Sequence, residues 1–285
     1  MKKKWILAAT FFTAVIALII NGPIPQDPAY HNFADKRNIL GVPNFMNVIT
    51  NLPFLFIGIA GIAVTLKASQ LEKRLKIISI ILFMGFILLL FGSSYYHYQP
   101  SHFSLVFDRL PILVIIMSLL SIFIYDYFGA SAGIKYFYFL NLMGVVSIIY
   151  WYHTELLGNG DLRLYIMLQF YPLVAIPLIL WLYKAPYNYT GEVICIFIAY
   201  GIARITEGLD KEIFSLTGFI SGHSLKHIFM AVAGGFIVIM AKNRFNLKKD
   251  SSFNNDRNFA LIGFMAFLSY IYNYNIIFVA FPILL

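Results

Sequence analysis

Nine apolar stretches, each long enough or nearly long enough to cross a lipid bilayer, dominate this sequence of 285 residues. A membrane-spanning helix needs about 20 mostly apolar residues. With 60% hydrophobic and only 12% charged residues, the chain carries more apolar surface than a soluble domain of this size could bury. The stretches lie at about 5–21, 44–66, 76–97, 105–125, 134–152, 162–183, 191–208, 220–241 and 258–283.

These stretches predict an all-α fold. Only helices and closed barrels satisfy every backbone polar group in lipid, and the alternating pattern of barrel strands is absent. Because the connections are short, we expect one polytopic helical bundle; the division into a seven-helix core with one extra apolar helix at each end follows from a family resemblance given below. The expected parts are residues 1–22 as a signal anchor or N-terminal transmembrane helix, 23–43 as a non-cytoplasmic segment, 44–245 as the seven-helix core, and 246–285 as a cytoplasmic loop with a C-terminal transmembrane helix.

The first stretch has the layout of a secretory signal, because Lys2, Lys3 and Lys4 precede the apolar run from Trp5 to Ile20. No small-x-small cleavage site follows this run. We therefore expect an uncleaved anchor with its N-terminus in the cytoplasm.

The distribution of positive charge predicts the orientation of the other helices, since cytoplasmic loops of membrane proteins carry an excess of Lys and Arg. In the loops expected on the opposite side, Asp and Glu offset the basic residues. The net charge of +8 thus reflects membrane orientation, and we expect no nucleic-acid partner. The basic residues of the expected cytoplasmic loops after the N-terminus are Lys67, Lys73, Arg74, Lys76, Lys135, Lys184, Lys242, Arg244, Lys248, Lys249 and Arg257.

The most conspicuous polar groups occur where three predicted helices reach the non-cytoplasmic side. The third stretch ends in GSSYYH at 92–97, the fourth begins with FDRLP at 107–111, and the eighth begins with GHSLKH at 222–227. Ionisable residues within spanning helices are costly and usually face the bundle interior with a function. We therefore expect one polar site where these three ends meet.

The histidines of this site predict a metal centre. His223 and His227 are four residues apart and share one helix face, the spacing of the zinc-binding H-E-x-x-H helix. His97 supplies a third nitrogen, and three protein ligands with one open position are typical of catalytic zinc. The Glu of the motif is replaced by Ser224, so Asp108 becomes the candidate general base.

Ser93 precedes His97 by four residues, and its hydroxyl could hydrogen-bond a developing oxyanion. Each residue also has a structural interpretation. The histidine pair could join helices by hydrogen bonds, and His97 could be an interfacial residue beside tyrosines. Asp108 with Arg109 could be a charge pair at a helix N-terminus, and Ser93 a small packing residue. The convergence of three helix ends favours the metal centre.

Other candidate ligands carry no comparable pattern. The single cysteine, Cys195, excludes a disulfide framework or a cysteine-based metal site within the chain. His31, His102 and His153 lie in loops or near interfaces, and no role is predicted for them. Glu207 and Asp210 precede the histidine helix and could bind a substrate head group or simply belong to a solvated loop; both remain open.

Four separated motifs, in order along the chain, resemble those of the alkaline ceramidases, most closely their bacterial branch. This family belongs to the superfamily of seven-helix membrane hydrolases that includes the adiponectin receptors. The resemblance covers about 35–245 and implies a seven-helix core, with the first and last apolar stretches outside it. The motifs are DKRNILGVPNFMNVITNLPF at 35–54, GSSYYH at 92–97, DRLP at 108–111 and SGHSLKH at 221–227.

The resemblance implies a zinc-dependent amidase of sphingolipid metabolism in a bacterial inner membrane, with its active site towards the non-cytoplasmic face. Its substrate would be ceramide or a related N-acyl lipid, hydrolysed to a fatty acid and a sphingoid-type amine. In this family the histidines matching His97, His223 and His227 bind zinc. The aspartate matching Asp108 contacts the zinc water, and the serine matching Ser93 assists at the oxyanion.

Animal alkaline ceramidases also bind calcium in the acidic segment before the first core helix. The corresponding residues here are Asp27, Asp35 and Asn44, with an amide where an acidic ligand is expected. Calcium prefers several carboxylate oxygens. The sequence therefore gives a candidate Ca²⁺ site that departs from the family pattern.

Three other functions compete with hydrolysis. A receptor-like, lipid-binding branch of the same superfamily would bind without turnover, against which the retained Asp108 argues. A transporter would place its site nearer the midplane and show repeats. A heme protein is disfavoured because two histidines at i and i+4 cannot approach one iron from opposite faces.

Overall fold

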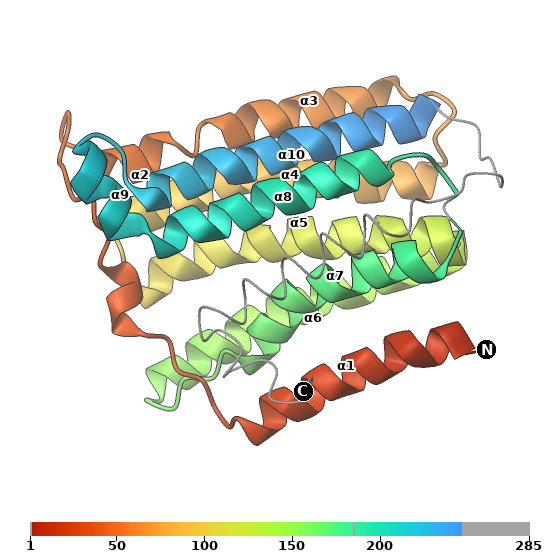
Figure 1. Ribbon diagram of the computed structural model, residues 1–285, viewed down its shortest axis with the longest axis horizontal. Helices are drawn as coiled ribbons and strands as arrows, with labels where there is room; N and C mark the ends of the chain where they lie inside the picture. The colour runs from red at the N-terminus through yellow and green to blue at the C-terminus, as the bar shows by residue number, and fades with distance from the viewer. Residues whose placement is uncertain (1, 185, 247–285) are drawn as a thin grey trace.

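The computed structural model describes residues 2–184 and 186–246, and within these residues the chain forms helices and no β-sheet (Figure 1). The all-α prediction is therefore confirmed. The helices are α1 (Lys2–Ile20), the 3₁₀ turn η1 (Pro28–His31), α2 (Phe45–Ile49), α3 (Pro53–Lys67), α4 (Lys73–Tyr98), α5 (His102–Phe128), α6 (Ala130–Leu156), α7 (Arg163–Leu182), α8 (Thr190–Gly208), α9 (Asp210–Thr217) and α10 (Gly222–Asn246).

Seven of the first eight apolar stretches each correspond to one long helix of the structure. The stretch predicted at 44–66 is broken into α2 and α3, and the second part begins at Pro53, which lacks a backbone N–H and fits the first position of a helix. The short, polar α9 was not predicted, because eight residues between two spanning segments carry no apolar signal. The ninth stretch, 258–283, and the rest of 247–285 lie outside the described residues.

Seven segments of the described chain are long and apolar enough to cross a membrane: α1, α2 with α3, α4, α5, α6, α7 and α10. This set differs from the predicted seven-helix core, because it contains α1 and lacks α8. The 19 residues of α8 include the charged Glu192, Arg204 and Glu207. Nevertheless α8 lies along α10 within the bundle (Figure 1).

The distribution of side chains fits a multi-pass membrane protein. Large apolar side chains such as Phe56, Phe91 and Ile149 are more than 60% exposed on the outer faces of their helices. Small hydroxyl side chains are buried inside, where Thr65 and Ser121 each donate to the carbonyl four residues earlier. A lipid solvent accepts the exposed apolar groups, and these local hydrogen bonds satisfy the buried hydroxyls.

The helices are arranged so that one end of the bundle collects the polar residues. α4 packs between α3 and α5, whereas α10 packs on α3 and α8. α1 lies at the edge against α7 (Figure 1). The chain from α1 to α2 then crosses the bundle end at which α4 stops and α5 and α10 start. It is fixed there by backbone hydrogen bonds from Leu162 to Ile24 and from Ala34 to the carboxylate of Asp210.

A buried ion pair joins the helices at the opposite end. The guanidinium of Arg244 on α10 donates to both carboxylate oxygens of Asp126 on α5, at distances of 2.5 to 3.1 Å. The hydroxyl of Tyr189, just before α8, donates to the same carboxylate at 3.2 Å. Both charged side chains are at most 6% exposed, so each depends on the other for compensation of its charge.

We expect the Asp126→Ala variant to lose about 3–5 kcal/mol of unfolding free energy, because it leaves the Arg244 guanidinium buried without its counter-charge. Unfolding in detergent by denaturant titration measures this loss. The double variant Asp126→Ala with Arg244→Met should recover part of it, since both charges are then absent. Equal stability of the wild type and the single variant would show that the pair does not hold the helices.

Candidate metal centre

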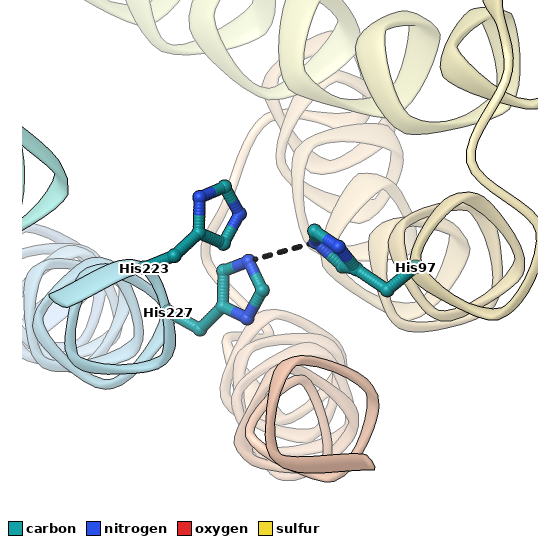
Figure 2. A group of neighbouring side chains, drawn as sticks. All are labelled: His97, His223 and His227. Carbon is teal, nitrogen blue, oxygen red and sulfur yellow. Dashed lines mark hydrogen bonds between the residues drawn. The ribbon is translucent and has the colours of Figure 1, made fainter. Parts of the chain in front are cut away.

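Three histidines from two helices meet at the polar end of the bundle. Figure 2 shows His223 and His227 leaving α10 and facing His97 of α4. Their ligand nitrogens lie within 4.8 Å of one another, and the Nε2 atoms of His97 and His227 are 3.2 Å apart. All three side chains are at most 5% exposed. Within the described chain, this is the one group of three or more His, Cys, Asp or Glu side chains close enough to hold a metal ion.

The hydrogen bonds of Thr50 determine which nitrogen of His227 is free. The Thr50 hydroxyl has one hydrogen, which it donates to the carbonyl of Met46 at 2.6 Å. Its oxygen lies 3.0 Å from Nδ1 of His227 and can therefore only accept a hydrogen bond there. The neutral ring carries its proton on Nδ1, so the lone pair of Nε2 points towards His97. Metal-binding histidines are oriented in this way by a partner on the second nitrogen.

The end of α4 is held in place by the segment that precedes α2. The side-chain amide of Asn44 donates to the carbonyl of His97 at 2.8 Å. Asn44 itself adopts a left-handed backbone conformation, with φ of 49°, which Asn tolerates better than most residues. The ring of Phe33 packs against His97 and His223, with centroids 4.7 and 5.0 Å away. This ring excludes water from one side of the triad.

The start of α10 is fixed by a close backbone approach. A Cβ on Gly222 would lie 1.9 Å from the carbonyl oxygen of Thr206, so only glycine lets α10 begin this close to α8. Next in the chain, the backbone N–H of His223 donates to the carboxylate of Asp210 at 2.7 Å. A carboxylate at a helix N-terminus is favoured by the helix dipole. Ser224, at the position of the missing Glu, donates to Asn47 at 2.6 Å and ties α10 to α2.

A second close approach brings the predicted base and serine together. Pro111 has no N–H, so the carbonyl of Phe107 has no helical donor four residues later. Gly92 of α4 packs on this carbonyl, where a Cβ would lie only 1.9 Å from the oxygen. At this contact Ser93 and Asp108 lie on the facing sides of α4 and α5, and both line one cavity. Both are buried, at 2% and 7% exposure.

A cavity of about 320 Å³ opens beside these residues. Ser93, Asp108 and His227 line it together, so the predicted base, the serine and one ligand face the same space. An apolar cavity of about 100 Å³ shares some of its lining, including Leu89, Ile112 and Met230, and extends the space into the middle of the bundle. The space therefore has a polar part next to the histidines, called here the polar head, and an apolar part in the middle of the bundle, called the apolar extension.

Of the two acidic residues that precede the histidine helix, Glu207 lines the cavity and Asp210 does not. Glu207 pairs with Arg204 and with Lys226, the latter at 2.8 Å. Asp210 starts α9 and accepts hydrogen bonds from the backbone of Ala34 and His223. Neither residue therefore belongs to a simple solvated loop.

The candidate calcium ligands each have their own protein partner. Asp27 accepts from the backbone of Ala29 at the start of η1, and Asn44 donates to His97 as described above. Both oxygens of Asp35 accept from Arg37. The calcium site stays a prediction.

Thr50, which orients His227, was missed by the sequence interpretation, since no spacing rule connects it to a residue 177 positions away. His31, which was assigned no role, lies over the bundle end and contacts the hydroxyl of Tyr96 at 2.9 Å and the ring of His102 at 3.1 Å. Burial lowers the pKa of His31, and the nearby His102 and Arg109 lower it further, so this ring is neutral at pH 7.

The donor set fits a metal ion. Within the described residues, Nε2 of His223 is buried without a hydrogen-bond partner, and the Nε2 atoms of His97 and His227 face each other 3.2 Å apart. Buried polar nitrogens are rarely left without a partner, and three neutral imidazoles suit borderline divalent metals such as zinc. The triad could therefore bind a metal ion.

Comparisons with known proteins found no match: no protein-family model, no curated protein sequence and no solved structure is similar to this chain.

We expect Thr50→Val to weaken the affinity for added Zn²⁺ by about 10- to 100-fold, because the Nδ1–H of His227 loses its acceptor and the ring loses its orientation. Competition with a chelator of known affinity measures this change. Thr65→Val is the matched control, since Thr65 is also buried and donates to a carbonyl four residues earlier, but on α3 away from the histidines. Equal zinc affinity of the two variants would contradict the role given to Thr50.

Proposed function

We propose that this protein is a zinc-dependent amide hydrolase of the membrane that cleaves ceramide-like N-acyl lipids into a fatty acid and a sphingoid-type amine. One observation carries the proposal: a buried triad of histidines lies beside Ser93 and Asp108 at the head of a cavity with an apolar extension. The resemblance of the four sequence motifs to the alkaline ceramidases supports the same reaction.

The reaction adds water across an amide. The oxygen of water bonds to the carbonyl carbon, the C–N bond breaks, and the products are a carboxylate and an amine. A zinc ion held by His97, His223 and His227 would supply a Lewis acid and lower the pKa of the attacking water. In this proposal Asp108 accepts the proton of that water and returns it to the leaving nitrogen. The Ser93 hydroxyl, which lines the same cavity, donates its hydrogen to the developing oxyanion.

The shape of the cavity supports a lipid substrate. The polar residues lie at its head, whereas side chains such as Phe86, Ile115 and Ile237 line the extension. An acyl chain in this extension would bury its apolar surface, and its carbonyl would stay near Ser93 and Asp108. A soluble substrate would gain nothing from such a space.

The charge distribution supports an active site facing away from the cytoplasm, in a bacterial inner membrane. The histidines lie at the bundle end opposite to Lys67, Lys73 and Arg244, which lie near the ends of α3, α4 and α10 beside the expected Lys- and Arg-rich loops. Such loops remain in the cytoplasm. The substrate would therefore come from the outer leaflet.

We expect purified wild-type protein to release fatty acid from N-acyl sphingosine, and Asp108→Asn to lower kcat by about 10²- to 10⁴-fold with its zinc retained, because an amide cannot accept the proton. Fatty-acid release measures turnover, and elemental analysis measures the metal. His227→Ala should lose both zinc and activity.

Asp161→Asn is the matched control, since Asp161 lies at the same end of the bundle, pairs with Arg163 and does not line the cavity. It should keep its activity. A zinc-loaded wild type that binds N-acyl lipids without cleaving any of them would contradict hydrolysis and favour a receptor-like role.

A further inference from the structure

Arg109 is a buried cation whose surroundings differ from those of four other arginines in the described part of the chain. Its side chain is only 5% exposed, and within the described chain it forms no ion pair. By contrast, Arg37, Arg163, Arg204 and Arg244 each pair with a carboxylate. A buried charge without a paired counter-charge is costly, so its retention calls for a function.

The contacts of Arg109 leave part of the guanidinium free. Its Cζ lies 4.3 Å from the ring centroid of Trp151 and 4.7 Å from that of Tyr165, so aromatic faces hold the planar group. Nη2 donates to the side-chain oxygen of Gln26. Nη1 is buried and has no hydrogen-bond partner among the described residues. The guanidinium is thus oriented, with N–H donors to spare.

Arg109 lines the same cavity as Ser93 and Asp108. Two other cations, Arg204 and Lys226, line it as well and share the single carboxylate of Glu207. The carboxylates of Asp27 and Asp108 also line the cavity, so its charged side chains balance overall. An anion entering the polar head would therefore be bound by the guanidinium of Arg109, which forms no ion pair among the described residues, and not by an overall positive charge.

We propose that Arg109 binds an anionic group, a carboxylate or a phosphate, on the amine side of the substrate. The inference rests on the proposed amide hydrolysis and narrows its substrate class. The acyl chain takes the apolar extension, so the polar head of the cavity, with Arg109, receives the amine part. Preferred substrates are then N-acyl amino acids or phosphorylated N-acyl amino alcohols, and neutral ceramides are poorer ones. A planar guanidinium matches both anions in a bidentate geometry.

Three amides with one acyl chain test this inference on the full-length protein in neutral detergent micelles: N-oleoylethanolamine, N-oleoylglycine and N-oleoyl-O-phosphoethanolamine. We expect kcat/KM for at least one anionic amide to exceed that for the neutral amide by about tenfold or more. A preference for N-oleoylglycine would identify the bound anion as a carboxylate, and a preference for N-oleoyl-O-phosphoethanolamine would identify it as a phosphate. Arg109→Gln should reduce the ratio of anionic to neutral kcat/KM by about 10- to 100-fold, the value of a charge-assisted hydrogen bond.

Arg163→Gln is the matched control, because it removes the same charge at the same end of the bundle from a residue that does not line the cavity. It should keep the wild-type ratio. Arg109→Lys retains the positive charge but not the planar, bidentate guanidinium. It should show part of the wild-type preference for anionic amides. If Arg109→Gln lowers kcat/KM for all three amides by one factor, Arg109 only holds the fold and the inference is wrong.

Binding of uncleavable analogues, in which a methylene replaces the amide nitrogen, separates this inference from the proposed reaction. Fluorescence titration is suitable because Trp151 stacks on Arg109. Tighter binding of the anionic analogues, lost in Arg109→Gln, would support the anion site even if no amide is cleaved, in which case only hydrolysis is refuted. Cleavage together with equal binding of neutral and anionic analogues would refute the anion site and leave hydrolysis standing.

Discussion

Two close backbone approaches set the positions of all the candidate functional groups. Where Gly92 packs on the free carbonyl of Phe107, α4 and α5 come close enough for Ser93 and Asp108 to line one cavity. Where Gly222 packs on the carbonyl of Thr206, the first turn of α10 lies level with the end of α4, and its histidines face His97. Helix association in lipid depends on such packing of small residues, because lipid provides no hydrophobic force between helices. The positions of the candidate functional groups therefore depend on glycine at residues 92 and 222, where any side chain would collide with a backbone carbonyl.

The parts of the site that follow from local rules were predictable from the sequence. Apolar length located the spanning segments, loop charge brought three helix ends to one side, and the i, i+4 spacing put His223 and His227 on one face. These rules describe each helix separately. The bond from Thr50 to His227 was not predictable, because it depends on how α2 and α10 pack. The role of Asn44, which holds the end of α4 through the carbonyl of His97, likewise became visible only in the folded chain.

The charged residues of the bundle divide into two kinds. Asp126 with Arg244, far from the histidines, compensate each other and hold helices together. Around the cavity, Glu207 pairs with two cations, whereas Arg109 forms no ion pair among the described residues and is held by aromatic rings and one amide. Unpaired buried polar groups are costly in any protein interior and more so in a membrane. The unpaired imidazole nitrogens and the unpaired guanidinium both occur at the same end of the bundle.

X-ray absorption spectroscopy at the zinc edge, on protein purified with its native metal, tests the metal centre most directly. We expect about one zinc per chain, with three imidazole nitrogens and one further oxygen at about 2.0–2.1 Å, the arrangement of a catalytic site with an open position. A shell of sulfur ligands, a zinc content far below one per chain after loading, or fewer than three imidazoles would contradict a metal centre built from His97, His223 and His227.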